Sequence, residues 1–412
     1  MVGRQPLGRG QDDVRRHNLA AVLGLVHEQG SSTRADLTRA LGLNRSTVGD
    51  LVGSLVEAGL LVEEKPAEVP GRVGRPSLVV QPRPGAVSVI AAFVDVHELD
   101  VARVGLGGHV LGRRREPLAG GASPLAAAQQ VATVAEDLLA DPGAPQAAGA
   151  VLAGVGLAVP GTVHAGAGTI AAAPNLGWHD VPFRALTADV VAARFGADVA
   201  VHVANDADLG LLGEIRRGAA VGRTDVVYLC GTYGLGGGVL SGGHPVTGRR
   251  GYAGEVGHIS VDPSGRACRC GSRGCWESEA LAAAWADPLE LDADAPDIAE
   301  QVLRRLEAGG VAARRTRDKL SRAFARGLAN VVNVFDPQSV LLGRGLWRDL
   351  WPALSDDVLP WVDRLVMPAM REGLEVRTAG LGADSTVWGA AELAFTELLA
   401  DPLGRPSSGV AV

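Results

Sequence analysis

Residues 255–277 read Glu-Val-Gly-His-Ile-Ser-Val-Asp-Pro-Ser-Gly-Arg-Ala-Cys-Arg-Cys-Gly-Ser-Arg-Gly-Cys-Trp-Glu, and this short stretch is the most informative part of the chain. It places one imidazole, His258, close to three thiols, those of Cys268, Cys270 and Cys275. Three thiolates and one imidazole are the donor set of a tetrahedral structural Zn²⁺ site. A disulfide or a redox pair is the alternative, but a Cys-x-Cys bridge would be strained. The stretch therefore predicts structural zinc held by these four residues.

Composition indicates more than one domain and an uneven charge. The chain has 412 residues, 47% of them apolar and 21% charged, and a net charge of −7. Residues 1–83 hold 11 basic and 9 acidic side chains, whereas the remainder holds 28 and 37. This asymmetry favours an N-terminal module that meets a polyanion and an acidic body that does not.

No segment of the sequence predicts secretion or a membrane span. The N-terminus carries charges throughout and has no apolar core of a signal peptide. Residues 142–179 contain no Asp, Glu, Lys or Arg, which could indicate a membrane span. Pro145, Pro160, Pro174 and many glycines interrupt this segment, however, which favours buried strands and turns. We expect a cytoplasmic protein.

The first 80 residues have the spacing of a helix-turn-helix. Apolar residues recur at helical spacing over 14–29, and Gly30 ends that helix. A second helix is expected over 34–41, ending at Gly42, and Asn44 is suited to cap a third. Two helices joined by a short glycine-centred turn are typical of DNA-binding modules.

Two short apolar runs after these helices predict the hairpin of a winged helix. The runs cover residues 60–64 and 77–80, and the expected tip between them carries Arg72 and Arg75 among glycines. Arginines on such a tip can follow phosphates or enter a minor groove. The alternative is a small helical dimerisation domain with a solvated basic loop. The residues that we expect at double-stranded DNA are Arg34, Asn44, Arg45, Ser46, Thr47, Arg72 and Arg75.

From residue 86 onward the pattern alternates between strands and helices. This alternation predicts an α/β body, with two similar lobes. The expected strands cover 87–94, 100–105, 151–159, 199–203, 226–229 and 238–240, and the expected helices cover 126–139 and 206–215.

Asn205 and Asp206 stand where an expected strand meets an expected helix. In α/β proteins this position commonly faces a ligand, and an amide beside a carboxylate can bind hydroxyl groups. A helix cap would explain one such residue without any ligand. The glycine-rich run 232–238 could cradle a phosphate or form a tight hairpin, and the chain has no Walker A sequence.

Together these motifs resemble the ROK family of bacterial repressors and sugar kinases. The resemblance covers about residues 86–400. It rests on residues 174–178, Asn205-Asp206, 232–238, 253–258, the cysteine cluster, 330–345 and 389–391. It implies an actin-like, ribonuclease-H-like body of two lobes, which in the family's repressors follows a winged helix. The implied domains are a winged helix-turn-helix at 1–84, a first lobe at 85–203 completed by a C-terminal helix at 386–402, and a second lobe at 204–385.

The resemblance also implies the residues of the site. Zinc would be held at the positions of His258, Cys268, Cys270 and Cys275. Sugar hydroxyls would be held by Asn205, Asp206, Glu255, His258 and Glu277. One ring nitrogen of His258 can bind zinc while the other donates to a hydroxyl.

The sequence departs from the family's kinases where ATP would bind. Those kinases carry Asp-x-Gly-Gly-Thr-Lys, whereas residues 95–100 read Asp-Val-His-Glu-Leu-Asp, so two carboxylates are expected to face the phosphate position. Tyr233 replaces a small hydroxyl residue, and Gly343-Arg344-Gly345 replaces a paired glycine. Carboxylates facing phosphates repel them, which predicts a degenerate nucleotide site.

These observations predict a sugar-responsive regulator of transcription, most simply a repressor of carbohydrate metabolism and not an enzyme. Its expected partners are operator DNA, a monosaccharide or its phosphate or N-acetyl derivative, and further copies of itself in a homodimer or homotetramer. One alternative is an active ATP-dependent sugar kinase with an accessory DNA-binding head, with Asp206 as general base. Another is a repressor that responds to a protein partner.

Overall fold

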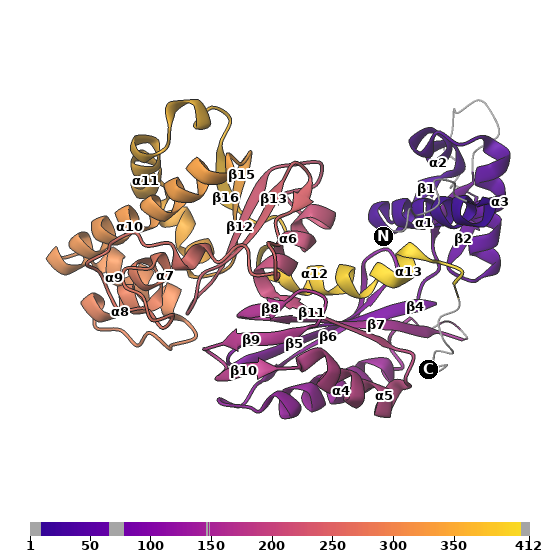
Figure 1. The fold of residues 1–412 in the computed structure, drawn as a ribbon, viewed down its shortest axis with the longest axis horizontal. Coiled ribbons are helices and arrows are strands. Elements are labelled where there is room, and N and C mark those ends of the chain that lie inside the picture. The colour runs from indigo at the N-terminus through magenta and orange to yellow at the C-terminus, as the bar shows by residue number, and fades with distance from the viewer. Residues whose placement is uncertain (1–9, 66–77, 146, 148, 405–412) are drawn as a thin grey trace, which may run out of the picture.

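The computed structural model describes residues 10–65, 78–145, 147 and 149–404. A small N-terminal head stands beside a larger body with two lobes, and the head lies at the end of the body that carries the first sheet (Figure 1). Among the described residues, no helix has both the length and the apolar character needed to cross a bilayer.

The head is a helix-turn-helix with a three-stranded sheet in the order β1-β3-β2. Its elements are α1 (Gln11–Gln29), β1 (Ser32–Thr33), α2 (Arg34–Leu41), α3 (Arg45–Glu57), β2 (Leu61–Glu64) and β3 (Val79–Pro82). Thr33 caps α2 by accepting from the N–H of Asp36 (3.1 Å), and Asn44 caps α3 by accepting from that of Thr47 (2.8 Å). The expected tip of the wing, with Arg72 and Arg75, lies outside the described residues.

The first lobe is built on a five-stranded sheet in the order β11-β7-β4-β5-β6. Its central strand β4 is buried along its whole length, because α4 and α5 cover one face of the sheet and α12 covers the other (Figure 1). The elements of the sheet and its covering helices are β4 (Val87–Val94), β5 (Glu98–Gly105), β6 (His109–Pro117), α4 (Pro124–Leu139), β7 (Val151–Val159), α5 (Phe183–Phe195), β11 (Ala200–Asn205) and α12 (Ser385–Ala394). A small antiparallel sheet contains β8 (Thr162–His164), β9 (Thr169–Ala173) and β10 (Trp178–Val181).

The second lobe repeats this strand order, as β14-β13-β12-β15-β16. In each sheet the first strand is central, an antiparallel hairpin lies on one side, and two parallel strands lie on the other. The elements are β12 (Val226–Gly231), β13 (Gly236–Ser241), β14 (His244–Pro245), α7 (Trp276–Ala280), α8 (Ala282–Leu289), α9 (Ile298–Ala308), α10 (Val311–Phe335), β15 (Ser339–Gly345), α11 (Leu346–Leu365) and β16 (Glu375–Thr378). The two similar lobes expected from the sequence are therefore confirmed.

Two helices cross between the lobes. Helix α6 (Asp206–Arg217) packs on β12 and β13 of the second sheet, whereas α12 packs on β4 and β7 of the first. Their backbones touch because both carry glycine at the crossing. A Cβ on Gly389 would lie 1.7 Å from the carbonyl oxygen of Leu209, and one on Gly213 would lie 2.3 Å from that of Ser385. The short helix α13 (Thr396–Ala400) follows α12.

Candidate ligand and metal site

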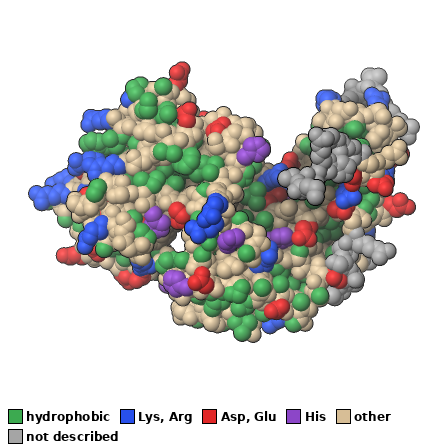
Figure 2. Space-filling view, viewed as in Figure 1, with side chains coloured by type: hydrophobic (Ala, Val, Ile, Leu, Met, Phe, Trp, Pro, Cys, Tyr) green, Lys and Arg blue, Asp and Glu red, His purple; other side chains and the backbone are tan. Residues whose placement is uncertain are grey.

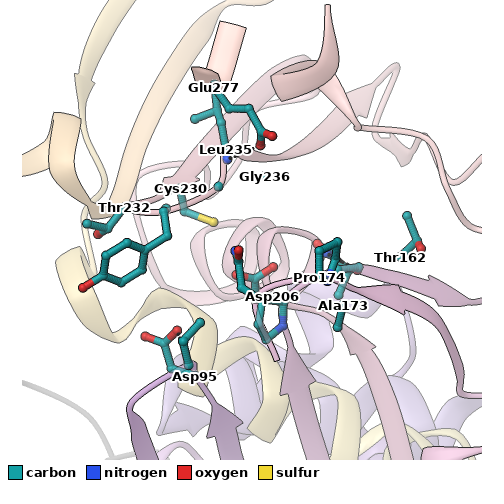
Figure 3. Close-up of a pocket in the computed structure, with 18 of the residues that line it drawn as sticks. Asp95, Thr162, Ala173, Pro174, Asp206, Cys230, Thr232, Leu235, Gly236 and Glu277 are labelled. Atoms are coloured by element: carbon teal, nitrogen blue, oxygen red, sulfur yellow. Dashed lines mark hydrogen bonds between the residues drawn. The ribbon is translucent and has the colours of Figure 1, made fainter. Parts of the chain in front are cut away.

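A cavity of about 490 Å³ lies between the two lobes. The first lobe contributes the β4–β5 turn and the end of β11, and the second contributes the β12–β13 turn, residues 253–258 and the start of α7. Asp95 and Asp206 approach it from one side, and Cys230 and Glu277 from the other (Figure 3). Acidic, basic and histidine side chains also gather along the boundary of the lobes at the surface (Figure 2).

Asn205 is the cap of α6, and Asp206 is not. Strand β11 runs to Asn205, two residues beyond the expected end, and delivers this side chain to the edge of the sheet. The Asn205 side-chain oxygen accepts from the N–H groups of Ala207 (2.8 Å) and Asp208 (3.1 Å), and its nitrogen donates to the carbonyl of Gly161 (2.8 Å). The carboxylate of Asp206 therefore stays available to the cavity that it lines.

The electrostatics of this wall favour carboxyl groups that change charge near neutral pH. Burial, together with the nearby carboxylate of Asp95, raises the pKa of Asp206 to about 7. Burial and Glu255 raise the pKa of Asp208 to about 7 as well. Sequence reasoning missed Asp208, although its place on the first turn of the helix after Asp206 is a visible signal.

Four side chains gather into a cluster that could hold a metal ion. The candidate ligand atoms of His258, Cys268, Cys270 and Cys275 all lie within 4.8 Å of one another. The Cys270 and Cys275 sulfurs are 3.7 Å apart, close to the spacing of about 3.8 Å that a tetrahedral zinc site requires. The loop can turn this tightly because Gly274 has a φ of 65°, and a Cβ there would lie 1.5 Å from the carbonyl oxygen of Asp262.

Two glutamates stand on either side of His258, which ends the short helix η1 (Val256–His258). The Nε2 atom of His258 lies 3.7 Å from Glu255, and its Nδ1 atom lies 3.6 Å from Glu277 and 3.7 Å from the sulfur of Cys268. Nδ1 therefore faces the sulfurs and Nε2 faces away from them. Burial raises the pKa of Glu255. The nearby carboxylate of Glu277 raises it further, while His258 lowers it. Glu277 also accepts from the N–H of Leu235 (3.3 Å).

The five residues expected at a sugar, Asn205, Asp206, Glu255, His258 and Glu277, all line the one cavity. The glycine run beside them forms a tight hairpin, one of its two expected roles, but with a shorter turn than expected. Gly236 and Gly238 belong to β13, where Gly236 pairs with Cys230 of β12, so the turn itself covers only 232–235. The reason is close packing, since a Cβ on Gly238 would lie 2.8 Å from the carbonyl oxygen of Ala207 in α6.

The β4–β5 turn is closed by an ion pair between the lobes. The Arg344 guanidinium lies 3.0 Å from Asp95 and 3.4 Å from Glu98, and it covers the ring of Phe93 at 5.0 Å. The expectation that two carboxylates of residues 95–100 face the phosphate position holds for Asp95 and Glu98, which line the cavity, but not for Asp100. Asp100 is buried in β5 and pairs with Arg113 (2.6 Å) and Arg115 (3.0 Å), because β6 places these arginines beside it.

In the head, the start of α3 exposes Arg45 and Ser46, with Thr47 half-buried behind them. Ser46 donates to the side chain of Asn44 (2.7 Å), so Asn44 acts here as a cap. Arg34, also expected at DNA, donates from Nε and from one terminal nitrogen to Glu63 of β2. A DNA phosphate would have to compete with Glu63 for this arginine.

Some known proteins are similar to this chain over nearly its whole length, and others over about half of it. The sequence pattern described as the ROK family matches residues 132–397. The xylose repressor of Bacillus spizizenii is 24% identical over 389 residues, covering 94% of this chain and 97% of that protein. The glucokinase of Thermotoga maritima is 32% identical over 257 residues, covering 58% of this chain and 78% of that protein.

A crystal structure described as a ROK family transcriptional regulator, a homologue of the E. coli MLC protein, has a TM-score of 0.75. It is 22% identical and covers 95% of this chain and 98% of that one, so the likeness extends over head and body and shows the fold. The family pattern spans more than half of the residues. The chain belongs to the ROK family, with a helix-turn-helix head ahead of the family's two-lobed body.

Proposed function

We propose that this protein is a sugar-responsive regulator of transcription, most simply a repressor, that binds operator DNA through its head. The observation that carries this proposal is the pairing of a cavity lined by carboxylates, an amide and an imidazole with a helix-turn-helix head in one chain. The similarity to a xylose repressor over nearly the whole length supports it. The ligand would be a monosaccharide or a close derivative of one.

On this proposal, Asn205, Asp206, Glu255, His258 and Glu277 bind the sugar. The carboxylates would accept hydrogen bonds from hydroxyl groups, and the Nε2 side of His258 would donate one. Asp208 is a sixth candidate, because it lines the cavity next to Asp206. Hydrogen bonds to charged groups contribute about 1.5–3 kcal/mol each, so loss of one should be measurable.

We also propose that His258, Cys268, Cys270 and Cys275 hold a structural Zn²⁺. The donor set and the mutual distances fit this ion. The metal would fix the loop that carries Glu255 and Glu277 on either side of His258, so it would shape the cavity without taking part in chemistry.

A sugar kinase is the second candidate, supported by the glucokinase similarity and by the raised pKa of Asp206, the position of a general base. The Arg344 ion pair argues against it. Phosphoryl transfer needs backbone or cationic groups on the phosphates. Here the turn offers His97 and Glu98 instead, and Arg344 is already paired. We therefore propose that the protein does not use ATP.

We propose the same domain boundaries that the sequence predicted. The head would be residues 1–84, the first lobe 85–203 with 386–402, and the second lobe 204–385. A homodimer or homotetramer in the cytoplasm would present two heads to one operator, which would offset the small positive charge of a single head.

An electrophoretic mobility-shift assay tests the proposal. Fragments flanking the protein's own gene are incubated with it at several salt concentrations, with and without D-xylose or D-glucose. We expect a sequence-selective, salt-sensitive shift that one of the sugars changes. If no fragment shows a sequence-selective shift, the proposal is contradicted.

A further inference from the structure

Helix α6 connects the cavity to the head. Its N-terminal end carries Asn205 and Asp206 at the cavity, and its C-terminal end carries Arg216 and Arg217. The helix has 12 residues, which corresponds to a length of about 18 Å. A side chain at one end therefore reaches the ligand site while one at the other end reaches a different part of the molecule.

Arg217 joins three separate parts of the protein. Its guanidinium donates to Glu392 of α12 (2.6 Å), to the carbonyl of Gly107 in the β5–β6 turn (3.2 Å), and to the carbonyl of His27 in α1 (3.3 Å). These partners belong to the helix on the first sheet, to the first sheet itself, and to the head. Next to it, Arg216 forms an ion pair with Glu28 of the head.

This junction is buried and its hydrogen bonds fix its geometry. His27 is fully buried and Glu392 is 6% exposed. The Gly107 N–H donates to Nδ1 of His27 (3.0 Å), and Nε2 of His27 lies 2.8 Å from the Arg217 guanidinium and 3.2 Å from the carboxylate of Glu392. A buried carboxylate depends on such partners, so Glu392 holds Arg217 and His27 in one arrangement.

The junction lies where the two lobes would move against each other. The hydrophobic core of the head, with Leu23 and Val26, continues into Val87 and Val104 of the first lobe, so the head rests on that lobe. Helix α6 packs on the second sheet, where a Cβ on Gly210 would meet the ring of Tyr228 at 2.3 Å, and its Leu209 also joins the core shared by the head and the first lobe. Rotation of one lobe against the other therefore moves α6 across α12, and the end of α6 moves relative to the head.

We infer that Arg217 is a positioning residue that couples occupation of the cavity to the orientation of the DNA-binding head. This inference rests on the proposed function and names the route of its regulation. A ligand held between the lobes at Asp206 changes the angle of α6, and Arg217 passes that change to His27 and Glu392. The coupling requires that the ligand bind one lobe arrangement more tightly than the other.

The test compares the response of DNA binding to sugar, not DNA binding itself. The full chain is titrated onto the fragment selected by gel shift, with and without D-xylose and D-glucose, and the ratio of the two dissociation constants is measured. We expect a ratio of about 5–150 for the wild type and below about 2 for Arg217→Met. Sugar affinity, measured by calorimetry, should stay within about two-fold, because Arg217 lies a full helix length from the cavity.

Three further variants separate coupling from damage. Arg223→Met is the matched control, because Arg223 forms its ion pair with Glu375 of the second lobe, and this variant should keep the wild-type ratio. Arg217→Lys keeps a cation for Glu392 and should restore part of the response. Glu392→Gln keeps the shape of the side chain and should lose the response even if Arg217→Met fails to fold.

The outcomes distinguish this inference from the function on which it rests. A wild type that binds DNA but ignores both sugars would overturn the proposed function and the inference together. A wild-type response that persists unchanged in Arg217→Met and Glu392→Gln would overturn the inference alone.

Discussion

Asn205 and Asp206 have different roles at the start of α6, which the sequence alone could not assign. A strand end followed by Asn-Asp predicts a cap and a ligand residue, but either side chain could serve as the cap. The structure assigns the cap to Asn205 through two hydrogen bonds. The consequence is an Asp206 carboxylate that is half-buried at the cavity and has no ion-pair partner within the described part of the chain, and its raised pKa follows from burial and from the nearby Asp95.

We expect Asp206→Asn to remove part of the pH dependence of stability. A carboxyl group whose pKa is raised to about 7 in the folded state binds a proton that the unfolded chain releases near pH 4. Its stabilising contribution is therefore complete below pH 4 and is lost as the pH rises through 7. Wild type should lose on the order of 1–3 kcal/mol between pH 5 and pH 8, and the variant should lose less.

Denaturant unfolding at pH 5, 6, 7 and 8 measures this difference. Asp198→Asn is the control, because Asp198 is an exposed carboxylate of the first lobe. If the free energy of unfolding varied with pH in the same way for wild type and Asp206→Asn, the pKa of Asp206 would not be raised in the folded state.

The cysteine loop is the element whose chemistry the sequence predicts best. Residue types and spacing alone named the four ligand candidates, and the structure brings their ligand atoms within 4.8 Å of one another. The reason is that the loop closes on itself over few residues, so its geometry depends little on the rest of the fold. The β4–β5 turn is the opposite case, since the partner of Asp95 is Arg344, far along the chain.

We expect Cys270→Ser to lose bound zinc and stability. Elemental analysis of the wild type should find about one zinc per chain, and the variant should retain much less. Its melting temperature should fall by at least about 5 °C. Ser272→Ala, an exposed neighbour in the same loop, serves as the control and should keep both properties. Wild-type protein without zinc, or with a melting temperature unaffected by chelators, would contradict the metal assignment.

The ion pair at the β4–β5 turn predicts the absence of kinase activity. In a coupled ADP-release assay with ATP, Mg²⁺ and either D-glucose or D-xylose, the rate should equal the background without protein. Arg344→Ala should also stay inactive, because removing the ion pair restores neither glycines nor a lysine to residues 95–100. A known sugar kinase provides the positive control. Turnover well above background would show that the turn still admits ATP.

At the scale of the whole molecule, the sequence predicts those parts of the fold that depend on local contacts. Periodicity and caps predicted the helices of the head, and alternation predicted two similar lobes. The crossing of α6 and α12 was not predictable, because Gly213 and Gly389 lie far apart in sequence and neither stands out as a packing residue. The same holds for His27, whose partner Glu392 is 365 positions away.

The arrangement of these parts suggests how the protein works as one unit. The residues proposed to bind the sugar line the boundary between the lobes. The head shares a hydrophobic core with the first lobe, and Arg216 and Arg217 at the end of α6 also contact it. A change in the angle between the lobes therefore changes where the head lies relative to the second lobe. In an assembly of two or more copies, such a change would alter the spacing of the heads and hence their fit to an operator.

The most direct measurement is the dissociation constant for the selected DNA fragment, by fluorescence anisotropy, with and without saturating D-xylose or D-glucose. Wild type should change its DNA affinity about 5–150-fold with one of the sugars, and Glu255→Gln should need a much higher sugar concentration for the same change. Glu307→Gln, on the exposed face of α9, should respond like the wild type. A DNA affinity that is the same with and without each sugar, in protein that carries its zinc, would contradict the account.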